Sequence, residues 1–487
     1  MDATLEQSLT FGQRFQRKMA ESRIFALSLL IHTSLVFLAG TIYLFKAVTD
    51  PPDFVAEGGD GLIAAPDNLP APQETPPDAV PTETVQPTTP AINTPTLDVI
   101  TTTSNTNTFK ITTAAPKITL SVASSDLTKT NAAAVKGASG GVGGLPGAMS
   151  GRMGTGKQKA MVQNKMTTRA EQAVVRGLEW LRQHQNPDGS WGEENKGAMT
   201  GFALLCFLGH GETNDSAQYG LTVNKAVQWI IDNGTKHQGR LSMEGSFSQP
   251  GVYSHGICTY ALGEYVAMTK DERVIELFKQ AIKYITDGQG PGGGWMYSYD
   301  KSEDDLSVSG WQIQALKAAH LSGLNLPGVD AALDKAMDMI DRLQGGKGGY
   351  GYRKAEDKYS LTGVGILCRL FWKGEKGKVH KGLEWMLDTT EKEKPVKYKS
   401  DHADLYAWYY DTQACLMYGG IAWTRWNKWF QDELCDVQNP DGSWPAPGGK
   451  EGPGPSREEN LSGQTYRTSL CILMLEVFYR YMPTTQG

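Results

Sequence analysis

Side chains that could bind or transform a ligand lie where a series of apolar segments begins. Aromatic rings and carboxylates are mixed there, and together they suit a sugar, a peptide or an amphipathic ligand. Acids, tyrosine and histidine could also act as general acids or bases. The candidates are Tyr253, His255, Asp305, Ser307, Trp311, Asp404, Tyr409, Tyr410, Asp411, Gln464 and Tyr466. The alternative for each residue is a polar rim whose hydrogen bonds are satisfied within the protein.

The apolar segments that must position these residues recur at a regular spacing. Each starts with a small-residue step, and the glycines Gly201, Gly256, Gly310 and Gly363 are 55, 54 and 53 residues apart. Two weaker copies follow toward the C-terminus. Because these segments are apolar nearly all round, they predict six helices that are buried on every side.

Amphipathic helices alternate with the apolar ones. We expect them at residues 168–184, 221–233, 271–287, 329–343, 376–389 and 422–437. Six hairpins of one buried and one half-exposed helix predict an all-α toroid of two concentric rings over residues 166–487. The alternative is an open solenoid, which needs polar caps at both ends. The strongly apolar last helix, which includes residues 470–475, argues against it.

A second motif, Gln-x3-Gly-x-aromatic, recurs where the amphipathic helices end. Its glutamine and aromatic positions are Gln185 and Trp191, Gln289 and Trp295, Gln344 and Tyr350, and Gln438 and Trp444. We expect the glutamine to bond free carbonyls at the helix C-terminus and the glycine to supply a positive φ. The aromatic ring would cover the next hairpin. These roles are structural.

The fullest copy reads Arg176-Gly177-Leu-Glu-Trp180-Leu181, then Gln185, Gly189 and Trp191. It resembles the QW motif of squalene–hopene and oxidosqualene cyclases, whose toroid also occurs in protein prenyltransferase β-subunits. The resemblance covers about 320 residues. It implies the α/α-toroid fold more strongly than an activity, because one fold hosts many functions.

The resemblance leaves catalysis open, because the cyclase acid segment D-x-D-D-T-A is not intact. The corresponding stretch opens the third inner helix, and one alignment puts Asp305 at the first Asp, with Ser307 and Val308 in place of the proton donor and its neighbour. A shifted alignment keeps Asp304 and Asp305 but leaves them in a loop before the helix. There we expect solvated carboxylates that cap the helix and offset its dipole.

No cofactor or metal is expected. The Asp-x-Cys zinc ligands of prenyltransferases are missing, and the apolar flanks of the six cysteines indicate buried small hydrophobes. The net charge of −6 argues against a nucleic-acid binder. An aromatic-walled cavity would favour isoprenoid chemistry, an acidic open groove would favour a carbohydrate-active α/α barrel, and a filled ring would favour docking alone.

The N-terminal region predicts a membrane anchor. Residues 24–45 contain no Asp, Glu, Lys or Arg, and as a helix they would span about 33 Å. Basic residues precede this span and acidic residues follow it, so the positive-inside rule places residues 1–23 in the cytoplasm. We expect a single-pass inner-membrane helix at 24–46 with the C-terminal domain in the periplasm.

Two polar residues, Ser28 and His32, share one face of the predicted span. A titratable side chain in a bilayer is costly and indicates function, although a histidine facing headgroups is the alternative. With its position and the linker after it, this pair resembles the N-terminal segment of TonB-type energy transducers. The resemblance implies that the face packs on a proton-driven motor of the ExbB/ExbD type.

Residues 47–165 lack helical periodicity and predict an extracytoplasmic linker, which we call the tether. Its first part is Pro/Thr-rich, disordered and extended, and its last part is Gly-rich. Residues 109–124 could form one or two short strands. The sequence thus favours a docking head on a tether, coupled through its anchor to an inner-membrane motor and binding an unknown envelope ligand or outer-membrane protein. The alternative is an enzyme of the terpenoid cyclase or prenyltransferase class, or a carbohydrate-active barrel, and a third possibility is a purely structural spacer.

Overall fold

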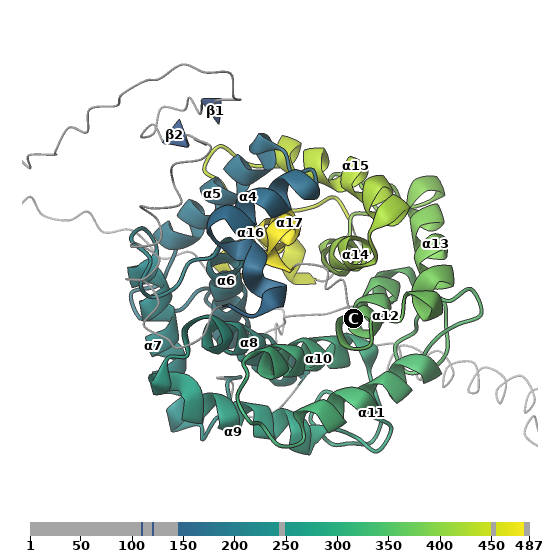
Figure 1. The fold of residues 1–487 in the computed structure, drawn as a ribbon, viewed down its shortest axis with the longest axis horizontal. Helices are drawn as coiled ribbons and strands as arrows, with labels where there is room; N and C mark the ends of the chain where they lie inside the picture. The colour runs from purple at the N-terminus through teal and green to yellow at the C-terminus, as the bar shows by residue number, and fades with distance from the viewer. Residues whose placement is uncertain (1–108, 111–118, 121–144, 243–248, 450–453, 482–487) are drawn as a thin grey trace, which may run out of the picture.

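Six helical hairpins form two concentric rings (Figure 1). The computed structural model describes residues 109–110, 119–120, 145–242, 249–449 and 454–481. The outer helices are α5 (Thr168–Gln183), α7 (Gly220–Lys236), α9 (Glu272–Gly288), α11 (Val329–Arg342), α13 (Lys376–Lys392) and α15 (Gly420–Val437). The inner helices are α6 (Lys196–His210), α8 (Gln249–Thr269), α10 (Leu306–Leu321), α12 (Tyr359–Trp372), α14 (Leu405–Tyr418) and α16 (Leu461–Leu475). The predicted all-α toroid is confirmed.

The two rings follow from the two hydrophobic patterns. In α6 every residue from Gly197 to Gly209 is buried, as expected for a helix with neighbours on all sides. In α9 the buried residues recur along one stripe, and the charged residues face solvent. An apolar helix therefore enters the inner ring, and an amphipathic helix covers it from outside.

The regularly spaced glycines allow the inner helices to approach one another closely. A Cβ atom on Gly201 of α6 would lie 2.9 Å from the Cα atom of Cys258 in α8. A Cβ on Gly363 of α12 would overlap the carboxyl group of Asp411 in α14. The spacing of these glycines thus reports the spacing of backbone contacts around the inner ring.

The ring closes between its last and first hairpins. The backbone N–H of Thr167, the cap of α5, donates to Gln431 Oε1 of α15 at 2.6 Å. The hydroxyl of Ser462 in α16 accepts from the N–H groups of Glu193 and Glu194 before α6, both at 2.9 Å. These bonds join both layers across the junction, so the open solenoid is excluded.

The glutamine of each turn forms a bond that differs from the predicted one. Gln185 Nε2 donates to the carbonyl oxygen of Gly189 in its own turn at 3.0 Å and to that of Thr222 in the next outer helix at 2.9 Å. The tryptophan instead reaches the helix end, since Trp191 Nε1 donates to Leu181 O at 2.8 Å. Gln289 with Trp295 and Gln438 with Trp444 repeat both bonds. In the third copy Gln344 donates to the Gly348 and Lys378 carbonyls and to the hydroxyl of Tyr350. The glutamine is therefore a link between neighbouring hairpins, and the tryptophan is the helix cap.

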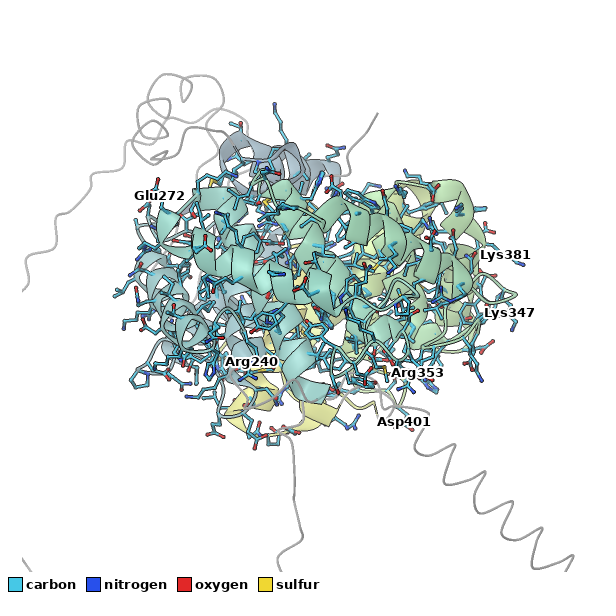
Figure 2. The ribbon with its side chains drawn as sticks, turned by 90° about the horizontal axis from the view of Figure 1, so that it is seen from below. Arg240, Glu272, Lys347, Arg353, Lys381 and Asp401 are labelled. Carbon is cyan, nitrogen blue, oxygen red and sulfur yellow. The ribbon has the colours of Figure 1, made fainter. Side chains whose placement is uncertain are left out.

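The turns give the ring two different faces. The N-terminal ends of the inner helices and the glutamine turns share one face, which we call the turn face. Figure 2 shows the head from the side, with the turn face at its lower edge. Along that edge lie Arg240, Arg353 and Asp401, which precede α8, α12 and α14. Glu272, which begins outer helix α9, lies near the opposite edge, which we call the tether face.

Part of the predicted tether belongs to the folded head. The predicted linker runs to residue 165, but η2 (Gly147–Arg152) and α4 (Gly154–Gln163) already pack on the ring with Met149 and Arg152 buried. The sequence missed them because a Gly-rich segment carries no helical periodicity. Farther upstream, β1 (Phe109–Lys110) and β2 (Thr119–Leu120) pair antiparallel.

The predicted membrane span and the six cysteines are the remaining features. Among the described residues, no helix is both long enough and apolar enough to cross a membrane. The predicted span at 24–46, with Ser28 and His32, lies outside those residues. All six cysteines are buried and unbridged.

Candidate functional site

Aromatic side chains from helices that are not neighbours in the inner ring meet inside it. Trp311 of α10 stacks on Tyr409 of α14, with ring centroids 5.5 Å apart, although α12 lies between those helices in the ring. On its other side Trp311 meets Phe202 of α6 edge-on at 5.3 Å, and Phe202 meets Tyr466 of α16 at 5.5 Å. Tyr410 packs against both Trp311 and Tyr409. Sequence reasoning grouped four of these five residues and missed Phe202, whose position inside an apolar helix carries no polar signal.

Two hydroxyl groups of this aromatic cluster are linked through Gln314. Tyr409 donates its hydroxyl to Gln314 Oε1 at 3.2 Å, and Gln314 Nε2 donates to the hydroxyl of Tyr410 at 3.1 Å. All three side chains are fully buried. The predicted ligand-lining residues at this level are buried and pack against one another inside the inner ring.

Two cavities in the described part of the chain lie away from this aromatic cluster. One small space of about 10 Å³ is lined by Phe371, Gln413, Leu416, Met417, Val477, Arg480 and Tyr481. A groove of about 460 Å³ lies on the surface around residues 319–331, between α10 and α11. Neither is lined by a predicted site residue.

A hydrogen-bonded chain of three predicted residues lies at the turn face. Ser307 Oγ donates to Asp305 Oδ1 at 2.6 Å, so the Tyr253 hydroxyl, 2.6 Å from Ser307 Oγ, donates to the serine. Asp305 Oδ1 also accepts the backbone N–H groups of Ser307 at 2.9 Å and Val308 at 3.2 Å, which caps α10. The carboxylate is a helix cap, as its position suggested.

The expectation that Asp305 is solvated is wrong. Its side chain is fully buried, because Tyr297 and Arg353 from neighbouring loops cover it. Tyr297 donates its hydroxyl to Asp305 Oδ2 at 3.3 Å, and Arg353 Nε lies 3.6 Å from the same oxygen. Burial raises the pKa of Asp305, while its bonds to Ser307 and Val308 and the charge of Arg353 oppose the rise. Both oxygens are engaged by the protein, so none is left to protonate a substrate.

Asp304 serves the neighbouring turn. Its Oδ1 accepts the backbone N–H of Gly294 at 2.9 Å, and its Oδ2 pairs with Arg342. The side chain is 10% exposed. It therefore holds the glutamine turn that precedes α10 and does not face the ring axis.

His255 faces the outer ring and not a cavity. Its Nδ1 accepts the backbone N–H of Leu241 at 3.0 Å, so the proton is on Nε2, which donates to Ala281 O of α9 at 3.0 Å. Burial lowers the pKa of His255 to about 4, which keeps the ring neutral. It is a satisfied core histidine that ties α8 to α9.

The other predicted residues are a helix cap, a glutamine bonded to its own loop, and one unusual acid. Asp404 caps α14 by accepting the N–H groups of Tyr406 and Ala407, both at 3.1 Å. Gln464 folds back to donate to Glu459 O at 2.8 Å. Asp411 is fully buried, and neither carboxylate oxygen has a hydrogen-bond partner among the described residues. Burial raises its pKa well above the ordinary value.

A cluster that sequence reasoning missed lies at the tether face. Glu264 of α8 bonds Arg152 at 2.8 Å and Arg480 at 3.3 Å, and all three side chains are buried. Burial alone would raise the pKa of Glu264, but the two guanidinium groups lower it to about 2. A signal was present, since Glu264 is the one charged residue in the apolar stretch 249–269 and a buried charge needs a partner.

Metal ligands are not gathered in the described residues, where no group of three or more His, Cys, Asp or Glu could hold an ion. Asp304, Asp305, Asp404 and Glu264 are instead bound by arginines, hydroxyls and backbone N–H groups of the chain itself.

Comparison with known proteins finds structures but no sequence relatives. No protein-family model and no curated protein matches the chain. An inactive variant of an α-1,6-mannanase of Salegentibacter in complex with α-1,6-mannotriose matches with a TM-score of 0.47 and 11% identity, over 63% of this chain and 99% of that one. A variant of a type II terpene cyclase from Scytonema, in complex with geranylgeranyl dihydroxybenzoate, matches with a TM-score of 0.44 and 13% identity, over 64% and 97%. Likenesses this weak indicate no function, and the toroid is established here by the chain's own helices.

Proposed function

We propose that this chain is a membrane-anchored envelope protein whose toroidal head docks on a partner and does not transform a substrate inside the ring. The observation that carries the proposal is the buried aromatic cluster of Phe202, Trp311, Tyr409, Tyr410 and Tyr466, in which side chains of four inner helices pack together inside the ring. A reacting isoprenoid or glycan would need that space. Recognition must therefore use the outside of the head.

The acids at the turn face support the same conclusion. A general acid must hold a proton within reach of the substrate. Asp305 is buried under Tyr297 and Arg353 and caps a helix, and Asp304 holds a turn. Neither carboxyl group meets that requirement.

The second half of the proposal concerns the anchor. The predicted helix at 24–46 would place Ser28 and His32 on one face within the bilayer, in the manner of TonB-type transducers. We propose that this face binds an inner-membrane complex of the ExbB/ExbD type and that the tether connects the complex to the head. This half is supported by the charge-free span, by the basic residues before it and the acidic residues after it, and by the Pro/Thr-rich linker that follows.

Crosslinked pull-down of the full-length protein from membranes tests the coupling. His32→Ala should lose an ExbB-like partner, whereas Thr33→Ala, one position away on a different helix face, should retain it. Recovery of the same inner-membrane partners with both variants would reject the coupling.

An assay of turnover tests the non-catalytic head. Wild-type protein should convert neither polyprenyl nor glycan substrates, and Asp305→Asn and Asp304→Asn should behave identically. Product formed by the wild type and lost in either variant, with its melting temperature preserved, would instead establish the enzyme alternative.

A further inference from the structure

We propose that the end of the tether and the C-terminal residues form one force-transmitting clamp over the tether face, with Arg152 as the residue that passes a pull on the tether to the ring. The clamp consists of Arg152, Asn164, Glu264, Arg480 and Tyr481. It rests on the proposed function only in that an inner-membrane motor would supply the pull, since the clamp itself is a feature of the fold.

The clamp lies where the tether and the C-terminus converge. Helix α17 (Val477–Arg480) follows inner helix α16 directly, and Figure 1 shows it beside α16 and α4 within the outer ring. Arg152 ends η2, just before α4, and donates to Leu208 O near the end of inner helix α6 at 3.3 Å. The tether therefore reaches the interior of the head and is not attached to the outer helices alone.

Arg152 is held on several sides at once. Its Nη1 bonds Glu264 Oε2 at 2.8 Å, and its Nε donates to Arg480 O at 2.9 Å. Its guanidinium lies 5.1 Å from the centroid of the Tyr481 ring. The side chain is 1% exposed, although Met153 beside it in sequence is 40% exposed. A single buried guanidinium thus joins the tether to an inner helix and to the C-terminal segment.

The tether also bonds the end of the chain directly. Asn164, the cap residue after α4, donates its amide to Phe478 O at 2.6 Å. With the bond from Arg152 to Arg480 O, it supplies partners to two carbonyls of α17 that a short terminal helix cannot satisfy itself. Helix α17 is consequently shaped by the tether as much as by α16.

Glu264 makes the arrangement cooperative. One carboxylate is shared by Arg152 and Arg480, and the hydroxyl of Tyr481 donates to it as well. Withdrawal of Arg152 into water would leave this buried group with one cation and would free the Arg480 carbonyl. A pull that extracts Arg152 therefore loosens the C-terminal segment in the same event.

The direction of the pull determines which contact meets it first. Force applied through the tether enters the folded head before η2, and Arg152 is the first charged residue of the head that it meets. The later contacts, Lys157 to Glu171 at 2.9 Å and Trp423 to Asn164 O at 3.0 Å, bind the tether to α5 and α15 on the outer ring. The first yielding event should therefore be release of Arg152 and α17, with the rings intact.

Optical-tweezers pulling on the full-length chain in nanodiscs tests this proposal without any motor. One handle is placed at Thr130 in the tether and the other at exposed Lys279 on α9, so that the load passes from the tether into the ring without crossing the predicted membrane anchor. Arg152→Ala should lower the force of the first event, and Lys159→Ala, which removes an exposed cation from the same segment, should leave it unchanged. Equal first-event forces in the wild type and Arg152→Ala would overturn the proposal.

A second variant covers the case in which Arg152→Ala fails to fold. Arg152→Lys keeps a cation beside Glu264 but loses the bond from Nε to Arg480 O. A first event weaker than in the wild type supports the shared load, and one of wild-type strength rejects it. Because no motor is present, these results are independent of the His32→Ala pull-down.

Discussion

Gln438, in the turn after the last outer helix, donates its side-chain amide to Ala173 O in the first outer helix at 2.9 Å. Gln185 makes the same bond to Thr222 and Gln289 makes it to Ala332, each in the next outer helix. The contact that joins neighbouring hairpins therefore also joins the two ends of the repeat. The ring closes because the turn after the sixth outer helix bonds the first outer helix, as each earlier glutamine turn bonds the outer helix that follows it.

Removal of Gln438 should weaken that closure. Gln438→Ala loses the bonds that its amide donates to Ala173 O and Gly442 O and those that its oxygen accepts from Arg176, so unfolding free energy should fall by about 1–3 kcal/mol. Denaturant unfolding measures the change. Gln183→Ala, on the exposed surface of α5, should cost less than about 0.5 kcal/mol. A cost for Gln438→Ala no larger than that of the control would contradict closure through this bond.

Asp411→Asn should stabilise the protein at neutral pH. Burial raises the pKa of Asp411 above its unfolded value, so its contribution is fully present below that unfolded pKa and is lost as pH rises through the folded pKa. Asparagine does not ionise, and the gain at pH 7 should be on the order of 1 kcal/mol or more. Thermal melts at pH 4 and pH 7 should show the gain shrinking toward pH 4. A variant less stable than the wild type at both pH values would show that this carboxyl group has a stabilising partner.

Glu264→Gln should be strongly destabilising. It leaves two buried guanidinium groups without their carboxylate, a change that typically costs about 3–5 kcal/mol. Because the pKa of Glu264 is lowered to about 2, its stabilisation is present above the unfolded value and is lost as pH falls toward 2. Acid unfolding of Glu264→Gln should accordingly be less pH-dependent in that range. Glu276→Gln, exposed on α9, is the matched control and should follow the wild-type curve.

Trp311→Ala should reveal how fully the inside of the inner ring is packed. Loss of the indole that contacts Phe202, Tyr409 and Tyr410 leaves a cavity and should cost about 3–5 kcal/mol. Trp385→Ala, which removes a partly exposed indole from the outer ring, should cost clearly less. If chemical denaturation gave equal costs, the inside of the ring would be loosely filled and the argument for a docking head would lose its main support.

The pattern of apolar and amphipathic segments was enough to predict both rings of the fold. Predicted outer-helix bounds such as 329–343 and 422–437 lie within two residues of α11 and α15, because burial on one face or on all faces leaves a direct record in residue order. Helices η2 and α4 were not predicted, and the cause is the opposite one. Those helices are held by Arg152 and Asn164 through contacts with distant residues, and no local periodicity records such contacts.

Residue types at the starts of the inner helices were visible in the sequence, but their roles were decided by the tertiary structure. The sequence determined that Asp305 would begin a helix, and it was compatible with a solvated acid, a catalytic acid or a cap. Folding brought Tyr297 and Arg353 over that carboxylate and turned His255 toward the outer ring. Whether a polar group faces water, a ligand or another part of the chain depends on which distant segments pack against it, and the toroid fixes those neighbours only when it closes.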